Sequence, residues 1–327
     1  MTPGIPALDP AAVLALAADE PGYDAGWWRG AVRGGLFAGS FGATVDAVRR
    51  LAGAAVPSPV HNGFVQSGAV LAALGAHEEV AALRSGARRY AFARTGPDGT
   101  DDVSTRAEGG RLYGTKCFVP YAASADVLLV VARTGVFAVE RAAPGVRLEP
   151  IPTIGLDRSC AVHLDGAPAT SLGTAPLETA LARGVIALAA DALGAAEAAL
   201  RHAVERVTAR PPLARRQAVR HRCADMLLDT TLTAGVVERA VRLVDDGAPD
   251  GEIRRAAAVA KAVASERCRR VTASAHQLGG GEGIHADQPL HLWYRRVKAA
   301  EPVLGAPRSH RAAIAAALLD PRPEGSG

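Results

Sequence analysis

The apolar pattern of the sequence changes at Pro176, and this change constrains the fold more than any other feature. Beyond it, apolar residues recur at alternating spacings of three and four, which places them on one face of a helix. The three long segments with this spacing are residues 177–207, 223–244 and 253–278. A shorter helical pattern begins after Pro302 or Pro307 and ends at Leu319. Helices with such faces bury them against one another, so we predict an antiparallel four-helix bundle over residues 173–320.

The sequence before Pro176 has two parts. Residues 89–172 contain short apolar runs separated by turn residues, which favours a small sandwich or barrel. Its predicted strands are residues 90–94, 111–119, 127–133, 136–140, 146–151 and 161–164. Residues 1–88 carry helical patterns at 10–18, 41–51, 65–74 and 78–85. The predicted fold class is therefore α+β and mainly α, with an N-terminal helical domain, a middle β domain and a C-terminal bundle.

Composition excludes several classes of protein. The 327 residues are 49% hydrophobic, enough for a sizeable core, and the net charge of +4 is dispersed rather than gathered in a basic block that would bind nucleic acid. The four cysteines form no CxxC pair and the histidines form no metal motif, which favours free thiols in a reducing cytoplasm and no metal site. No uncharged apolar run is long enough to span a bilayer, and no signal peptide is evident. We expect residues 321–327 to be disordered.

A run of glycines follows the third long helical segment. Residues 279–283 read Gly-Gly-Gly-Glu-Gly, and a basic helical turn at 292–298 comes shortly after. Glycine ends helices and also lets a ligand approach the backbone closely, so the run is either a helix cap with a turn or a surface for a nucleotide. A dinucleotide-binding glycine loop would have to follow a strand and open a helix. Here a helix precedes the glycines, which excludes that motif.

Three motifs, taken with this order of domains, resemble the acyl-CoA dehydrogenase family. The first is Gly-Thr-Lys-Cys-Phe-Val at 114–119, followed by Ala125 and Asp126, which looks like the family's strand pair at the flavin. The second, at 216–226, resembles the family's second bundle helix. The third is Gln-Leu-Gly-Gly-Gly-Glu-Gly at 277–283, followed by Tyr-Arg-Arg-Val-Lys at 294–298. The resemblance covers residues 60–318.

The resemblance implies chemistry and a cofactor. In the family, FAD takes a hydride from Cβ of an acyl-CoA thioester while a carboxylate removes the Cα proton, and an electron-transfer acceptor reoxidises the flavin. The family positions that hold the pyrophosphate and adenosine of a neighbouring subunit's FAD match Arg206, Thr208, Gln277, Gly280 and Gly281. The positions at the flavin itself match Thr100, Phe118 and Val119. Outside this pattern, Arg206 would be interpreted as a solvated arginine of the bundle.

Other positions depart from the family pattern at the flavin. Where the family has a threonine–glutamate pair, this chain has Arg94 and Thr95. Where the family has a hydroxyl residue that donates to the flavin, this chain has Pro120, which has no donor. After Thr208, this chain has Ala209 and Arg210 where the family has phenylalanine and glycine. These departures predict a weakened flavin site in this subunit.

The catalytic residues stay unassigned, because neither family position for the base holds a carboxylate. One matches Leu304, and the other matches Ala182, directly before Arg183, which corresponds to a family arginine near the active site or to a structural ion pair. Glu178 and Glu301 each lie about one helical turn away from these positions and could reach in. Their other interpretation is that of ordinary surface glutamates.

The N-terminal region is short for the family, and short members are known to form mixed oligomers in which a sister subunit keeps the base. The leading interpretation is therefore a cytoplasmic acyl-CoA dehydrogenase, or a subunit of one, in a homo- or hetero-oligomer, acting in lipid or steroid breakdown. The alternatives are a catalytically silent partner that completes a sister subunit's FAD site, and a protein of this fold with other acyl-thioester chemistry. We expect no nucleic acid as a partner and no membrane insertion.

Overall fold

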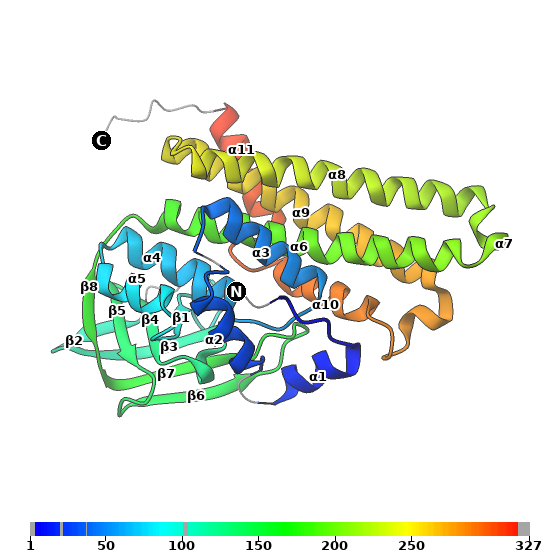
Figure 1. Cartoon of the computed structure of the whole chain (residues 1–327). Coiled ribbons are helices and arrows are strands. Elements are labelled where there is room, and N and C mark those ends of the chain that lie inside the picture. The colour runs from blue at the N-terminus through cyan, green and yellow to red at the C-terminus, as the bar shows by residue number, and fades with distance from the viewer. Residues whose placement is uncertain (1–3, 20–21, 37, 101–103, 320–327) are drawn as a thin grey trace. The chain divides into compact units, whose positions relative to one another are not determined.

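The computed structural model describes residues 4–19, 22–36, 38–100 and 104–319 of the chain (Figure 1). Their contacts form two compact units. The first takes in the described residues of 15–38 and 57–184, and the second those of 4–14, 39–56 and 185–319. The division predicted from sequence, at 1–88, 89–172 and 173–320, remains a proposal. The tail whose disorder was predicted lies outside the described residues.

The first unit contains two four-stranded sheets. One has the order β1-β4-β5-β8, with β1 and β4 parallel, and the other has the order β2-β3-β7-β6 and is antiparallel. The strands are β1 (Tyr90–Ala93), β2 (Arg106–Glu108), β3 (Arg111–Pro120), β4 (Val127–Ala132), β5 (Gly135–Glu140), β6 (Val146–Ile151), β7 (Ser159–Pro168) and β8 (Thr170–Gly173). Sequence analysis missed β2 and β8, which are short and largely exposed and therefore lack the apolar alternation of a buried strand.

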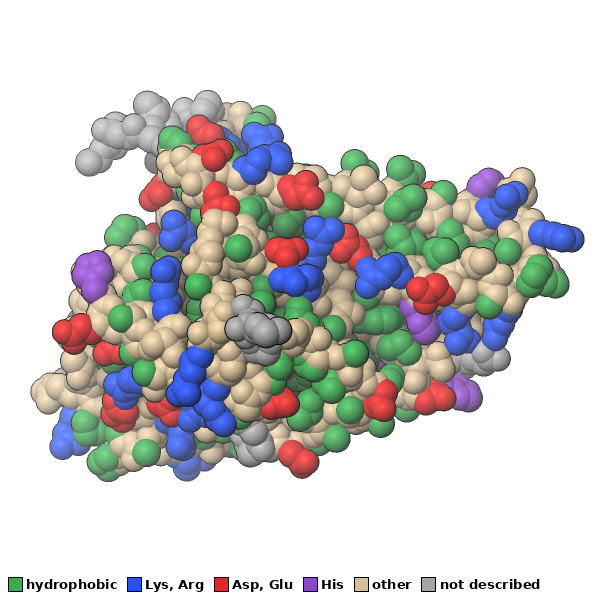
Figure 2. Space-filling model, in the orientation of Figure 1, with side chains coloured by type: hydrophobic (Ala, Val, Ile, Leu, Met, Phe, Trp, Pro, Cys, Tyr) green, Lys and Arg blue, Asp and Glu red, His purple; other side chains and the backbone are tan. Residues whose placement is uncertain are grey.

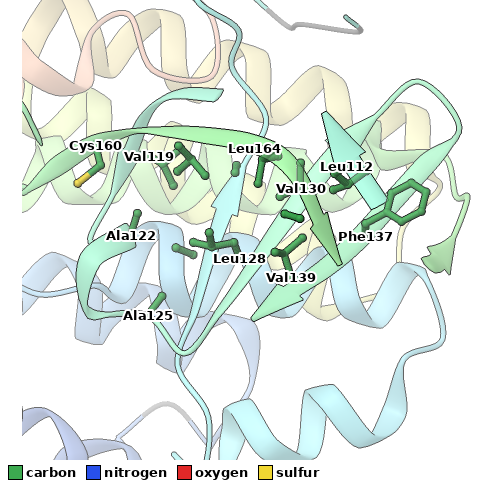
Figure 3. Close-up of a cluster of buried hydrophobic side chains, with 14 of the residues drawn as sticks. Leu112, Val119, Ala122, Ala125, Leu128, Val130, Phe137, Val139, Cys160 and Leu164 are labelled. Carbon is green, nitrogen blue, oxygen red and sulfur yellow. The ribbon is translucent and has the colours of Figure 1, made fainter. Parts of the chain in front are cut away.

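The two sheets share one apolar core (Figure 3). Leu128, Val130 and Val139 of one sheet gather with Leu112 and Leu164 of the other, and all five side chains are buried. Inward-facing residues alternate along β4 and β7, as packing of two sheets face to face requires. The predicted small sandwich is confirmed as part of an α+β fold that is mainly α.

Helices of the first unit come before the strands. They are α2 (Ala25–Arg33), the π-helix η1 (Val60–Gln66), α4 (Ser67–Ala73) and α5 (His77–Arg84), and a single 3₁₀ turn, η2 (Ala122–Ser124), lies between β3 and β4. The side chain of Asn62 fixes η1 to β1: it donates to the carbonyl of Phe92 at 3.0 Å and accepts from the Phe92 N–H at 2.8 Å. Gly63 permits this approach, because a Cβ there would lie 2.8 Å from the carbonyl oxygen of Tyr90.

The second unit holds the bundle. Its helices are α3 (Phe41–Gly53), most of α6 (Leu177–Thr208), α7 (Pro211–Ala214), α8 (Gln217–Asp245), α9 (Asp250–Gly279), the 3₁₀ turn η3 (Gly280–Ile284), α10 (Leu290–Ala300) and α11 (Pro307–Leu319). The residues of α1 (Pro10–Ala18) are divided between the two units. The long helices α8 and α9 pack side by side (Figure 1). The basic turn predicted after the glycines is the full helix α10. Helix α6 has the length and apolar composition of a membrane span, but 89% of the relevant window is buried, as in the core helix of a soluble protein.

Asp229 links α8 to α9 through two arginines. Its side chain is only 6% exposed, and its carboxylate accepts hydrogen bonds of 2.6 Å from Arg267 Nη1 and from Arg270 Nε and Nη2. Burial by itself raises the pKa of Asp229, but the hydrogen bonds from Arg270 and Arg267 outweigh it and hold the pKa below its usual range. The folded state therefore binds this proton less readily than the unfolded chain, and the carboxylate stabilises the fold above the ordinary pKa near 4.

We expect Asp229→Asn to lower the free energy of unfolding at pH 7 by about 1.5–3 kcal/mol, the usual contribution of a hydrogen bond to a charged group. The difference between variant and wild type should shrink as pH falls through the lowered pKa, because the wild-type carboxylate then becomes protonated. Urea unfolding at pH 7 and pH 3 measures this. A difference that is equal at both pH values would mean that the charge of Asp229 does not stabilise the bundle.

Candidate functional site

A bulge in β3 presents an aromatic side chain. Two residues of β3, Cys117 and Phe118, stand opposite one residue of β7 between the pairs Lys116–Val162 and Val119–Cys160. Phe118 has a φ of +54°, which is unfavourable for a residue with a bulky side chain, and it is 49% exposed. Strained backbone with an outward aromatic ring is typical of a ligand-binding position. Val119 is buried instead, at 1% exposure, so it supports the bulge from the core.

Two contacts fix the chain beside this bulge. The backbone N–H of Cys117 donates to the carbonyl of Thr95 at 2.9 Å, and the fully buried Lys116 donates through Nζ to the carbonyl of Arg94 at 3.1 Å. Arg94 and Thr95, which stand at the position of the family's threonine–glutamate pair, are thus held against β3. Sequence analysis did not single out Lys116, although a lysine in an apolar strand is a signal that could have been used.

Thr100 and Pro120 complete the set predicted around the flavin. Thr100 is exposed, and its N–H and Oγ1 bond the carboxylate of Asp98 at 3.0 and 2.8 Å in a local turn. Pro120 pairs with Ser159 at the end of β3 and offers no N–H to a ligand. The structure thus places Phe118, Val119 and Pro120 on one strand and Thr100 on a separate loop.

The second set of predicted residues gathers at one end of the bundle. Arg206 lies in the last turn of α6, and its Nη1 donates to Gln288 Oε1 at 2.9 Å, in the segment before α10. Gln277 lies in the last turn of α9 and accepts through Oε1 from Arg222 Nη1 of α8. Thr208 is the exposed last residue of α6. Arg206 therefore joins the end of α6 to the segment before α10, and Gln277 joins the end of α9 to the start of α8.

The glycines at this end leave the backbone open. Gly280 has a φ of +60° and a ψ of −148°, a region that is essentially restricted to glycine. A Cβ added at Gly280 or Gly281 would meet no described atom within 4 Å, and both residues are exposed. A cap alone would not need the second open glycine, so the geometry leaves room for a ligand against the backbone, as it does in glycine-rich anion sites.

The end of the bundle is strongly basic. Besides Arg206 and Arg222 it carries the exposed Arg210, Arg215, Arg216 and Arg220, and Figure 2 shows blue side chains at the end where Figure 1 labels α7. His202 lies one turn before Arg206 and packs edge to face against Trp293. Burial, and then the charge of Arg206, lower the pKa of His202, so its ring is neutral at pH 7. Sequence analysis missed Gln288 and His202, and it placed Arg222 only within the motif at 216–226. Only His202, four residues before Arg206 and so on the same helix face, had a usable signal.

The two positions that match the family's catalytic base hold no carboxylate. Ala182 is buried in α6, and Leu304 lies half-buried between α10 and α11. Glu178 is exposed, and Glu301 accepts from Lys298 Nζ at 2.9 Å and lies 3.9 Å from Arg269 Nε. Their surroundings fit surface glutamates. Arg183 is half-buried, and its Nε has no hydrogen-bond partner among the described residues.

Comparisons with known proteins bear on both parts of the site. A family model described as the acyl-CoA dehydrogenase C-terminal domain matches residues 173–319. An acyl-CoA dehydrogenase of Bacillus subtilis is 31% identical over 268 residues, which cover 72% of this chain and 70% of that protein. The chain belongs to the acyl-CoA dehydrogenase family. An acryloyl-CoA reductase (NADH) of Anaerotignum propionicum is 29% identical over 270 residues, covering 72% of this chain and 68% of that protein. The chain spans about two thirds of the length of the curated relatives that it matches first.

Solved structures of the family resemble the whole fold. A variant of the Tcur3481–Tcur3483 steroid ACAD is 28% identical with a TM-score of 0.84, covering 94% of this chain and 92% of that chain. The ChsE4–ChsE5 complex from Mycobacterium tuberculosis is 25% identical with a TM-score of 0.83, covering 96% of this chain and 93% of that chain. The interpretation as an acyl-CoA dehydrogenase or a subunit of one is confirmed at the level of the family, whose members are oxidoreductases acting on CH–CH bonds and form oligomers. The silent alternative is not favoured.

Proposed function

We propose that this chain is a subunit of an FAD-dependent enzyme that introduces the α,β double bond into an acyl-CoA thioester. The observation that carries the proposal is the basic end of the bundle, where Arg206, Gln277 and the open glycines 280 and 281 gather at the positions matched to the family's FAD site. Bound FAD would supply the acceptor for the hydride from Cβ.

The residues at this end suit the pyrophosphate of FAD. A guanidinium donates two parallel N–H groups to phosphate oxygens, and the exposed amides of Gly280 and Gly281 can donate without a side chain in the way. Phe118 offers an exposed aromatic face for a flavin ring, held in place by the bulge. Pro120 removes one donor to the flavin, so this chain's own flavin site is weaker than the site that its bundle end completes for a neighbour.

The absent carboxylate supports a mixed oligomer. With alanine at 182 and leucine at 304, no residue at either matched position accepts the Cα proton, and the proposed assembly obtains its glutamate from a second family member. Two of the similar structures, Tcur3481–Tcur3483 and ChsE4–ChsE5, are each named for a pair of proteins, and the name of the first describes it as a steroid ACAD. We therefore propose a cytoplasmic hetero-oligomer that acts on acyl-CoA side chains of bulky rings and passes its electrons to a separate acceptor protein.

We expect Arg206→Ala to weaken retention of FAD in the assembled oligomer. Loss of one charge-assisted contact to phosphate costs about 1.5–3 kcal/mol, or roughly 10- to 150-fold in affinity. The measurement is the flavin absorbance per subunit after dilution, together with the dissociation constant for added FAD.

The control is Arg201→Ala, which removes an exposed arginine from the same helix, five residues earlier. It should leave FAD affinity unchanged. An equal loss in both variants would show that general charge, rather than the site at Arg206, holds the cofactor. Unchanged affinity in Arg206→Ala, with the fold intact, would refute the assignment.

A further inference from the structure

Two arginines at the basic end of the bundle are bonded by glutamine amides rather than by carboxylates. Arg206 Nη1 of α6 donates to Gln288 Oε1 at 2.9 Å, and Arg222 Nη1 of α8 donates to Gln277 Oε1. Elsewhere in the second unit, arginines bond carboxylates instead: Arg49 bonds Glu197, Arg270 bonds Asp229 and Arg296 bonds Asp191. The kind of acceptor therefore changes at the end where the positions matched to the FAD site gather.

The two kinds of acceptor affect a guanidinium differently. A guanidinium carries only donors, so an amide oxygen and a carboxylate can each orient it. A carboxylate also brings a negative charge, and its two oxygens match the fork of the guanidinium, so it competes with a phosphate for the same N–H groups. An amide oxygen adds no net charge. Glutamine is therefore the suitable acceptor where an arginine has to be oriented and still bind an anion.

The backbone that carries Gln288 is fixed by its surroundings. The N–H of Gln288 donates to the carbonyl of His285 at 3.0 Å, and Pro289 follows as the N-cap of α10. Trp293 of α10 is only 8% exposed, and its Nε1 donates to the carbonyl of Gly53 at the end of α3 at 3.1 Å. The half-buried side chain of Gln288 therefore extends from an anchored segment, as a residue that orients another must.

His202 lies beside the same two side chains. Burial, and then the charge of Arg206, lower the pKa of His202. Contact with Gln288 opposes this lowering, as does the charge of Glu205, so both Arg206 and Gln288 lie close to the ring. The ring also packs against Trp293, with centroids 5.9 Å apart. Because the imidazole is neutral at pH 7, it does not repel the guanidinium beside it.

We propose that Gln288 is a positioning residue for the FAD site: its amide oxygen holds Arg206 in the orientation that meets the pyrophosphate, without adding a negative charge beside it. This role rests on the proposed function, because Arg206 has a pyrophosphate to meet only if FAD binds at this end. An arginine that is not held in advance has to be immobilised when the ligand binds, which lowers affinity roughly 2- to 10-fold.

The test compares two substitutions at 288 in the assembled oligomer, purified with its partner if it requires one. Gln288→Met keeps the length of the side chain and removes the acceptor, so the dissociation constant for FAD should rise roughly 2- to 10-fold. Gln288→Glu keeps a bond to Arg206 but adds a charge that competes with the pyrophosphate, so FAD should bind on the order of 10-fold more weakly or worse.

Gln288→Glu separates positioning for a ligand from a purely structural bond. If Gln288 only joined the segment before α10 to α6, the ion pair formed by glutamate would hold the two at least as firmly, and FAD affinity would be kept. Unchanged affinity in Gln288→Glu would therefore overturn the assignment of Gln288 to the FAD site. Titration of the FAD-depleted assembly with FAD, followed by flavin fluorescence, gives the dissociation constants.

A double-mutant cycle shows whether Gln288 acts through Arg206. In the Arg206→Ala background, Gln288→Met should change the dissociation constant by less than about twofold, since the group that it orients is gone. His291→Ala is the control, because it removes another contact of the same segment, to the Ala286 carbonyl at 3.1 Å, and should also stay within about twofold of wild type. An equal loss in His291→Ala, or an undiminished effect of Gln288→Met without Arg206, would mean that order of the segment, rather than orientation of Arg206, determines FAD affinity.

Positioning by Gln288 and the proposed function fail separately. If Arg206→Ala weakens FAD binding while both substitutions at 288 behave as wild type, Gln288 does not position Arg206 and the proposed function stands. If Arg206→Ala leaves FAD affinity unchanged, the FAD site at the end of the bundle is wrong, and the role of Gln288 falls with it.

Discussion

Replacing Leu304 with glutamate should raise the rate at which an acyl-CoA reduces the flavin of this chain assembled alone, by roughly 10²–10⁴-fold, the usual contribution of a general base. The wild-type chain without a partner should react slowly, because leucine at 304 and alanine at 182 leave the Cα proton without an acceptor at the matched positions. A carboxylate at 304 would supply a proton acceptor at one of these two positions.

The loop between α10 and α11 is already shaped for this substitution. Leu304 has a φ of +55° and Gly305 one of +102°, and the ring of His310 bonds the carbonyl of Leu304 at 3.0 Å. Lys261, only 1% exposed, donates at 2.9 Å to the carbonyls of Ala300 and of Glu301. These contacts involve the backbone of the loop rather than the side chain at 304. Glutamate at 304 therefore keeps the loop, at a backbone cost similar to that of leucine.

The protonation states at this loop set the conditions of the assay. Burial lowers the pKa of Lys261 to about 8, so the ammonium that holds the loop is present at pH 7 and is lost as the pH rises past 8. Burial, and then the charge of Lys261, lower the pKa of His310, so its ring is neutral at pH 7 and can donate one N–H to the loop. Anaerobic bleaching of the flavin by an acyl-CoA, followed at pH 7 in a stopped-flow instrument, measures the rate.

Leu304→Gln is the matched control, because it has the shape of glutamate and cannot accept the proton. It should stay as slow as wild type. Equal acceleration in both variants would mean that polarity at 304, not a base, limits the reaction. Rapid bleaching of the unaltered lone chain would refute the premise that it lacks a base, and Glu178→Gln and Glu301→Gln would then show which carboxylate serves.

The long helices could be predicted because their pattern repeats many times. Over α6, α8 and α9, apolar residues recur many times at the same period, so a single exception such as Leu227, which is 59% exposed, does not change the result. The end of α1 at Ala18 and the start of α3 at Phe41 were also placed correctly, at a break in the apolar pattern. The short α2, the exposed β2 and β8, and the π-helix η1 were not predicted, because few residues specify them and contacts distant in sequence, such as Asn62 with Phe92, determine their shape.

The candidate site was predictable only as a set of residue types. Arg206, Gln277 and the glycines came from motif resemblance, and their gathering at one end of the second unit follows from helices of nearly equal length. The bulge at Phe118 could not be inferred, since an inserted residue in β3 appears only when its register against β7 is known. Gln288 was missed for a related reason: its contact with Arg206 joins residues 82 positions apart.

The crossing of α3 and α6 depends on glycine in a way that the sequence does not reveal. A Cβ built on Gly194 would lie 2.0 Å from the carbonyl oxygen of Arg49 and 2.8 Å from its carbon, and Gly53 faces the carbonyl of Gly194 from the other helix. The guanidinium of Arg49 also donates to Glu197 through Nε at 2.8 Å, one turn beyond Gly194. The two helices therefore meet backbone to backbone, and no side chain can move aside to make room.

We expect Gly194→Ala to lower the free energy of unfolding by more than ~3 kcal/mol, above the usual range for an added methyl group in a core, because rigid backbone opposes it. Relief would require α3 to separate from α6, which would also stretch the Arg49–Glu197 contact. The matched control is Gly235→Ala in the exposed face of α8, where a Cβ meets no described atom within 4 Å; it should stabilise the chain by about 0.5–1 kcal/mol through helix propensity. Urea unfolding followed by circular dichroism compares the two. If Gly194→Ala proved as stable as Gly235→Ala, the close crossing of α3 and α6 would be wrong, since two alanines in helices differ only through what surrounds them.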